Sequence, residues 1–86
     1  MSAPLFTLYV KPGCAWCDEA VDWLNEHGYA YDEVDVISQA AAFAEMRRIS
    51  GQTKCPTLVA DEELLPDFDT DQLKRFLKEH GWLAAA

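Results

Sequence analysis

The sequence of 86 residues predicts an α/β fold, a four-stranded mixed sheet flanked by three helices in the order strand-helix-strand-helix-strand-strand-helix. An apolar run from Leu5 to Val10 is typical of a buried strand. Later segments carry apolar residues at helical spacing, and two short apolar runs separated by two acidic residues predict an antiparallel pair of strands. A chain of this length without linkers or repeats indicates one domain, residues 1–86.

The N-terminal half predicts a right-handed, parallel strand-helix-strand unit. The first strand ends at Pro12-Gly13, and a second strand is expected from Ala30 to Val36. Between them, residues 15–27 are expected to form an amphipathic helix that ends before Gly28. The predicted apolar side of this helix consists of Trp16, Cys17, Ala20, Val21, Trp23, Leu24 and His27.

The C-terminal half predicts two helices separated by a hairpin. Ser38 is expected to cap a helix that ends at Gly51, and strands over 57–60 and 63–65 flank an acidic turn. Asp69 and Gln72 have the spacing of a capping box for the last helix. Four aromatic residues are assigned to the core: Phe6, Tyr9, Phe43 and Phe76. Phe68 either lines a substrate groove or packs against the start of the last helix.

Composition excludes several classes of function. Asp and Glu number 15 against 7 Lys and Arg, and the net charge of −8 argues against binding to nucleic acid or to anionic membranes. The longest apolar run is too short to span a membrane, and no signal-peptide pattern is seen. Three cysteines, an odd number, do not form a secreted disulfide framework, so a reducing cytoplasmic location is expected.

Chemistry is concentrated at Cys14 and Cys17, two cysteines separated by two residues where a strand ends and a helix begins. The helix N-terminus favours a thiolate on Cys14, and a thiolate is the nucleophile of disulfide exchange. Cys17 points toward the core and is the natural resolving thiol. A zinc site would need Cys55 and a histidine as further ligands, and the other alternative is that both cysteines are small buried apolar residues.

The segment Lys11-Pro12-Gly13-Cys14-Ala15-Trp16-Cys17, together with the later Cys55-Pro56-Thr57 before a hairpin and a last helix, resembles a glutaredoxin. The resemblance extends from about Leu5 to His80 and implies a thioredoxin-like fold. It implies that Cys14 is the attacking cysteine and Cys17 the resolving one. It also implies a cis peptide bond at Pro56, with the Cys55 backbone offered to a substrate peptide as an extra strand.

Other site residues follow from the same resemblance. Lys11 matches a basic residue that stabilises the thiolate and attracts a carboxylate, and Gln52 matches a residue that helps hold the glycine carboxylate of glutathione. The alternative for Gln52 is a loop residue in solvent. Asp69 matches an acidic residue that caps the last helix and holds the amine end of glutathione. Trp16 is either a flat platform for substrate or an exposed flank of the helix.

The sequence also departs from the glutaredoxin pattern. Pro66-Asp67 stand where the family has a Gly-Gly pair, and Ala15-Trp16 replace Pro-Tyr between the cysteines. An additional carboxylate at Asp67 would repel an anionic ligand such as glutathione. Relatives that lack the proline include some that share a [2Fe–2S] cluster between two subunits. Cluster ligation needs four thiolates and the chain has one dithiol, so no tightly bound cofactor is expected.

Cys55 places a third sulfur beside the dithiol in the implied fold. It either fills space inertly, forms a disulfide with Cys14, or helps to hold a metal, and the inert role is favoured because that side chain need only pack. The sequence as a whole predicts a monomeric thiol-disulfide oxidoreductase that acts on disulfide-containing proteins with glutathione as reductant. The alternatives are an electron donor of the ribonucleotide-reductase type recharged by thioredoxin reductase, and a non-catalytic iron–sulfur or peptide-binding module.

Overall fold

The computed structural model describes residues 5–83 and has the element order predicted from the sequence. The strands and helices are β1 (Phe6–Val10), α1 (Ala15–Glu26), β2 (Tyr31–Asp35), α2 (Ala40–Ser50), β3 (Thr57–Ala60), β4 (Glu63–Pro66) and α3 (Thr70–Glu79). The strand order in the sheet is β2-β1-β3-β4, with β1 and β2 parallel and the other pairs antiparallel. The predicted mixed sheet with three helices is confirmed.

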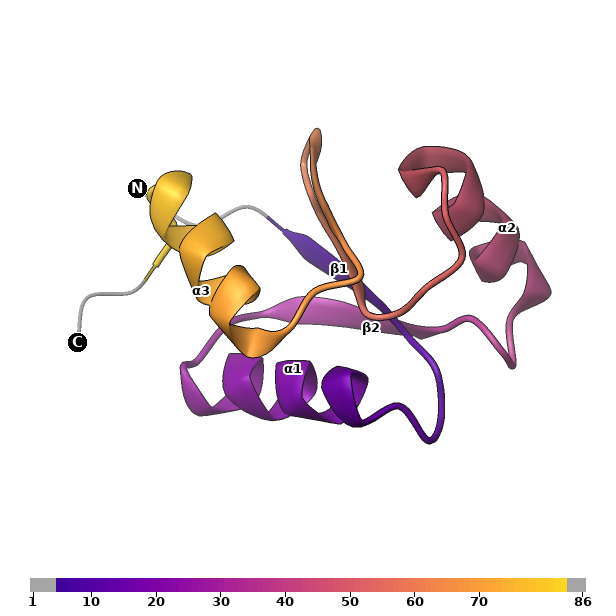
Figure 1. Ribbon diagram of the computed structural model, residues 1–86, viewed down its shortest axis with the longest axis horizontal. Helices are drawn as coiled ribbons and strands as arrows, with labels where there is room; N and C mark the ends of the chain where they lie inside the picture. Colours follow the sequence, from indigo (N-terminus) through magenta and orange to yellow (C-terminus); the bar gives the residue numbers. More distant parts are fainter. Residues whose placement is uncertain (1–4, 84–86) are drawn as a thin grey trace.

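The helices are divided between two regions of the molecule. Figure 1 shows α1 and α3 next to each other, with α2 set apart from both, and α1 and α3 are in contact. Residues of β1 contact both of these regions. Phe6 packs edge-on against Trp82, which follows α3, whereas Tyr9 lies near charged side chains of α2. Residues 11–14 join the end of β1 to the start of α1.

The core is built from β1, β3 and one side of each helix. The largest fully buried side chains include Phe6, Leu8, Leu24, Met46, Leu58, Phe68, Leu73 and Leu77. The core assignment holds for Phe6, Tyr9 and Phe76, while Phe43 is half-buried and packs against the core cluster. Phe68 is buried, which favours the packing role over the groove role.

Some local predictions were wrong. Helix α2 begins after Gln39 rather than Ser38, because Asp35 Oδ1 accepts hydrogen bonds from the backbone N–H groups of residues 37 and 38 and holds them in a turn. Trp16 is 47% exposed, although helical spacing placed it on the apolar side of α1. Cys17 and Ala20 of the same helix are buried, so the packed side of α1 is narrower than the apolar side that spacing predicted. Leu5 lies outside β1 and is exposed.

The last helix begins as predicted. The Asp69 side chain accepts from the backbone N–H of Gln72 at 2.8 Å, and Gln72 Oε1 accepts from the backbone N–H of Asp69 at 2.9 Å. This reciprocal pair satisfies two backbone donors that a helix start leaves without partners. The helix therefore has a defined first residue, which fixes the loop that joins it to β4.

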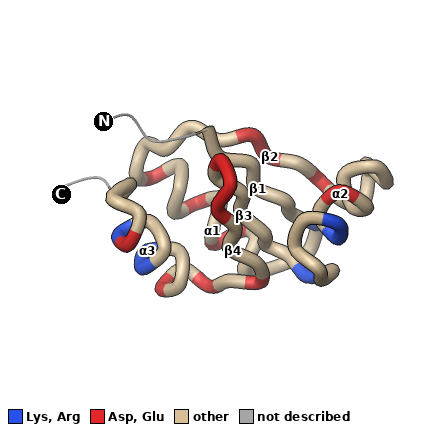
Figure 2. The backbone as a smooth tube through the Cα atoms, turned by 90° about the horizontal axis from the view of Figure 1, so that it is seen from above, with Lys and Arg blue, Asp and Glu red and all other residues tan. Residues whose placement is uncertain are grey.

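Acidic and basic residues are unevenly spread over the surface. Figure 2 shows acidic segments at the turn between β3 and β4 and along β2, while α2 and α3 carry basic and acidic segments together. None of the helices within residues 5–83 is long and apolar enough to cross a membrane.

Candidate active site

The start of α1 gives the two cysteines different surroundings. Gly13 has φ +74°, a backbone conformation that favours glycine, and it turns the chain from β1 into the helix. Cys14 is the N-cap with extended backbone, and its Sγ accepts a hydrogen bond from the Cys17 N–H at 3.4 Å. An N–H directed at sulfur is bound more strongly by a thiolate than by a thiol. Cys14 is partly exposed and is therefore accessible to a substrate.

Cys17 lies one turn further along α1 and points inward. It is 2% exposed, and burial, with the contact to Cys14 acting in the same direction, raises the pKa of its thiol to about 12. At neutral pH this thiol is protonated, so it is a poor nucleophile toward external reagents. It lies within reach of a disulfide formed on Cys14, which is the position that a resolving thiol requires.

The loop before β3 faces the dithiol. The Cys55–Pro56 peptide bond is cis, as the resemblance implied, and the Cys55 carbonyl oxygen lies 3.8 Å from Cys14 Sγ. The Cys55 side chain is 6% exposed and its Sγ contacts Met46 Sδ at 3.8 Å. Burial raises the pKa of the Cys55 thiol, with nearby Lys11 opposing that change. Packing against Met46 is the surrounding expected of an inert thiol.

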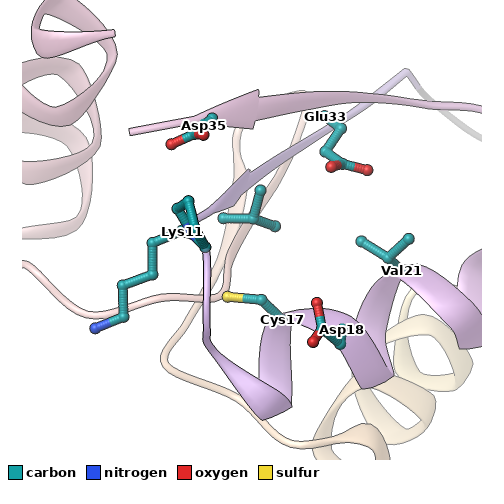
Figure 3. Close-up of a pocket in the computed structure, with 8 residues that line it drawn as sticks. Lys11, Cys17, Asp18, Val21, Glu33 and Asp35 are labelled. Atoms are coloured by element: carbon teal, nitrogen blue, oxygen red, sulfur yellow. The ribbon is translucent and has the colours of Figure 1, made fainter. Parts of the chain in front are cut away.

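Lys11 lies at the boundary between this loop and a cavity of about 170 Å³. Figure 3 shows its ammonium directed away from the carboxylates of Glu33 and Asp35, which line the cavity together with Asp18 and Cys17. The carboxylates make this cavity unfavourable for an anion. Lys11 also lies near Cys55, since its charge opposes the rise of the Cys55 thiol pKa, so a positive charge is present beside the loop that faces Cys14.

Gln52 has the most extensively bonded side chain of the loop. Its Nε2 donates to Ser50 Oγ at 3.1 Å and to Thr57 Oγ1 at 3.0 Å, and the backbone N–H of Lys54 donates to its Oε1 at 2.6 Å. The amide is thus engaged within the loop instead of pointing into solvent. The sequence contains no signal for this network beyond the polar character of these residues.

A second loop, between β4 and α3, lies near the first one. Lys54 Nζ lies 3.9 Å from Asp67 Oδ2, so an ion pair links the two loops, although both side chains are well exposed. Asp67 has φ +47°, which explains how an aspartate occupies a place where the glutaredoxin pattern has glycine. The Asp69 carboxylate is occupied by its helix cap on one oxygen. Sequence reasoning missed the Lys54–Asp67 pair.

The histidines proposed as alternative zinc ligands have other partners. His27 and His80 each cap a helix C-terminus, and each Nδ1 lies 2.8 Å from a backbone carbonyl oxygen of the preceding turn. Within residues 5–83, no group of three or more His, Cys, Asp and Glu side chains is arranged to hold a metal ion. The predicted residues that meet in one place are Lys11, Cys14, Cys17 and Cys55, whereas Trp16 flanks them on the exposed surface of α1.

A helix start that presents one exposed and one buried thiol to a loop ending in a cis-proline, on a β2-β1-β3-β4 sheet, defines a dithiol protein of the thioredoxin-like fold. The glutaredoxin family model matches residues 6–65. The chain therefore belongs to the glutaredoxin family, which implies thiol-disulfide oxidoreductase activity.

Individual relatives agree with this assignment. The chain is similar to a glutaredoxin of Neisseria meningitidis serogroup A, with 37% identity over 76 residues, 87% of each chain. It is similar in structure to the thioredoxin-like protein BC3987, with a TM-score of 0.76 and 29% identity, covering 84% of this chain and 99% of the other. The NrdH-redoxin of Escherichia coli shares the fold, with a TM-score of 0.70, 22% identity, and coverage of 83% and 92%.

Proposed function

We propose that this chain reduces protein disulfides and glutathione mixed disulfides through Cys14 and Cys17, with glutathione as the reductant, in a reducing compartment such as the cytoplasm. The observation that carries the proposal is the asymmetry of the dithiol, an accessible Cys14 at a helix N-cap and a buried, protonated Cys17 one turn away. This arrangement separates the attacking thiol from the resolving thiol.

The proposed reaction has two exchanges. The Cys14 thiolate attacks one sulfur of a substrate disulfide, so that a Cys14 mixed disulfide forms and the other substrate sulfur leaves as a thiolate. Cys17 then loses its proton to solvent and attacks the Cys14 sulfur, which forms the Cys14–Cys17 disulfide and releases the second substrate thiolate. Two glutathione molecules reduce that disulfide and leave as oxidised glutathione.

Glutathione would bind on the side of Cys14 that faces Cys55 and Pro56. The Cys55 carbonyl supplies an acceptor for the ligand backbone, and Lys11 supplies a positive charge for a carboxylate. Trp16 offers a flat apolar surface beside the sulfur, and Asp69 lies at the start of α3, where the ligand's amine end is expected. The carboxylate-lined cavity behind Cys17 has the wrong charge for the same ligand.

A second candidate is an electron donor that thioredoxin reductase recharges. Asp67 supports it, because this carboxylate stands at the loop where a glutathione site needs room and no added negative charge. The ion pair between Asp67 and Lys54 also removes a positive charge that an anionic ligand would use. Neither the charge of Asp67 nor the pairing of Lys54 would hinder a protein reductant, since its thiol pair can reach the disulfide without placing a carboxylate at this loop.

One coupled assay distinguishes the candidates. The protein is supplied with a disulfide substrate and either with glutathione and glutathione reductase or with thioredoxin reductase, and NADPH consumption is followed. Faster recovery with glutathione supports the first candidate, and faster recovery with thioredoxin reductase supports the second. Cys14→Ser should abolish turnover in either case, whereas the matched Cys55→Ser should retain it. Turnover that survives Cys14→Ser would refute the proposal.

A further inference from the structure

The side chain of Gln52 lies within its own loop, with both ends of the amide occupied. Nε2 carries two hydrogens and has three acceptors in range, Ser50 Oγ at 3.1 Å, Thr57 Oγ1 at 3.0 Å and the Lys54 carbonyl at 3.2 Å. Oε1 accepts from the Lys54 N–H at 2.6 Å. This side chain therefore has little capacity left to bind a ligand.

The partners of Gln52 belong to elements of the fold. Thr57 is the first residue of β3 and is 0% exposed, and Ser50 is the last residue of α2. Thr57 Oγ1 also donates to the Lys54 carbonyl at 2.9 Å, so the same carbonyl is held twice. Gln52 consequently ties the loop to the end of a helix and to the start of a central strand.

The tied segment leads directly to the part of the loop that faces the reactive sulfur. Gln52 bonds both backbone polar groups of Lys54, and the next carbonyl along the chain, that of Cys55, lies 3.8 Å from Cys14 Sγ. Since fixing Lys54 restrains the adjoining peptide units, the direction of the Cys55 carbonyl depends on the Gln52 amide.

We propose that Gln52 is a positioning residue, which holds residues 51–56 in the shape that presents the Cys55 backbone to a peptide linked to Cys14, without contacting that peptide. The inference rests on the proposed function and deepens it. It differs from the role that the family resemblance implies, in which this side chain holds the glycine carboxylate of glutathione. The two roles make opposite predictions for a substrate without that carboxylate.

The test uses two mixed disulfides of one reporter peptide, the first with glutathione and the second with γ-glutamylcysteine amide, which lacks the glycine and its carboxylate. Gln52→Ala should lower kcat/KM about tenfold on both substrates, mainly through KM, the loss expected when one or two hydrogen bonds no longer hold the loop. The matched control is Gln39→Ala, which removes an exposed glutamine side chain with no cap hydrogen bond. A loss confined to the glutathione substrate would overturn the inference, as would values within twofold of the control.

A double-mutant cycle gives an independent measure. If Gln52 acts through its network, Thr57→Val should reduce kcat/KM on both substrates, and the double variant should lose no more than Gln52→Ala alone. Independent effects that multiply, or a silent Thr57→Val, would contradict a network role. Because valine matches threonine in shape, this variant keeps the test valid if Gln52→Ala does not fold.

A further readout separates positioning from general damage. Alkylation of Cys14 by iodoacetamide, which needs no loop contact, should keep its wild-type rate within twofold in every folded variant. A fall in that rate equal to the fall in kcat/KM would overturn the inference. If the wild-type protein reduces neither mixed disulfide, the proposed function fails together with it, whereas an active wild type with a silent Gln52→Ala refutes the inference alone.

Discussion

The buried thiol of Cys17 should resist alkylation in the folded protein. Its pKa of about 12, against an ordinary value of 9.0, lowers the thiolate fraction at neutral pH about 1000-fold. A thiolate of higher pKa is also a stronger nucleophile, by a factor of about 20 for this difference. The net effect is a rate of reaction with iodoacetamide about 50-fold below that of the same cysteine in the unfolded chain, and steric burial adds to it.

The assay is timed alkylation at pH 7.5 followed by tryptic digestion and mass spectrometry. In Cys14→Ser, Cys17 is the only thiol of the tryptic peptide that ends at Arg47, while Cys55 begins a separate peptide after Lys54. The chain unfolded in guanidinium gives the reference rate. Because Cys14→Ser removes one of the causes but keeps burial, at least tenfold protection is expected in that variant, rising toward 50-fold in the wild type. Protection below threefold in both proteins would refute the assignment of Cys17 as a protonated resolving thiol.

Three further predictions concern charges around the site and the last helix. Asp67→Asn should raise the affinity for glutathione about fivefold, since one charge at about 4 Å in water contributes about 1 kcal/mol. Asp61→Asn, which changes another positive-φ aspartate, in the hairpin turn, should leave that affinity unchanged. Glutathione-dependent turnover measures the effect of each variant. Asp69→Ala should remove the capping box, cost about 1 kcal/mol, and lower Tm by about 4–8 °C in a thermal melt. A hydrogen bond to the Phe76 carbonyl, aided by Glu63, raises the pKa of His80 above 6.5. The contribution of His80 to stability is therefore full below pH 6.5 and is lost as the pH rises through the raised pKa. Glu63→Gln should weaken this pH dependence, which is measured as the difference between unfolding midpoints at pH 5.5 and pH 8.

Features set by neighbouring residues could be predicted from the sequence. The capping box of α3 needs only Asp69 and Gln72 at a fixed spacing, and the turn before α1 needs only Gly13 followed by an amphipathic pattern. The parallel pairing of β1 with β2 and the antiparallel pairing of β3 with β4 follow from the lengths of the connections between those strands. These predictions depend on interactions within a few positions of the chain, so the sequence alone carries them.

Features that need contacts between distant or competing groups could not be predicted. Ser38 is a good N-cap by type, but Asp35 in the preceding strand holds the backbone of that turn and shifts the helix start. Helical spacing counts Trp16 as apolar-facing, yet spacing cannot show that only part of the apolar side of α1 is packed, with Cys17 buried and Trp16 exposed. The hydrogen bonds of Gln52 could not be predicted either, because they depend on the positions of Ser50, Lys54 and Thr57 after folding.

The different surroundings of the two thiols follow from one turn of helix. Residues three positions apart on a helix lie on the same side, so Cys14 and Cys17 are brought together, and the backbone N–H of the second reaches the sulfur of the first. Cys14, as the N-cap, retains extended backbone and remains partly exposed, while Cys17 already follows the helical path into the core. A shift of the helix start by one residue would remove the N-cap hydrogen bond and move the second thiol off the core side. The position of Gly13, which turns the chain one residue before the cap, therefore determines which cysteine is partly exposed at the cap and which is buried.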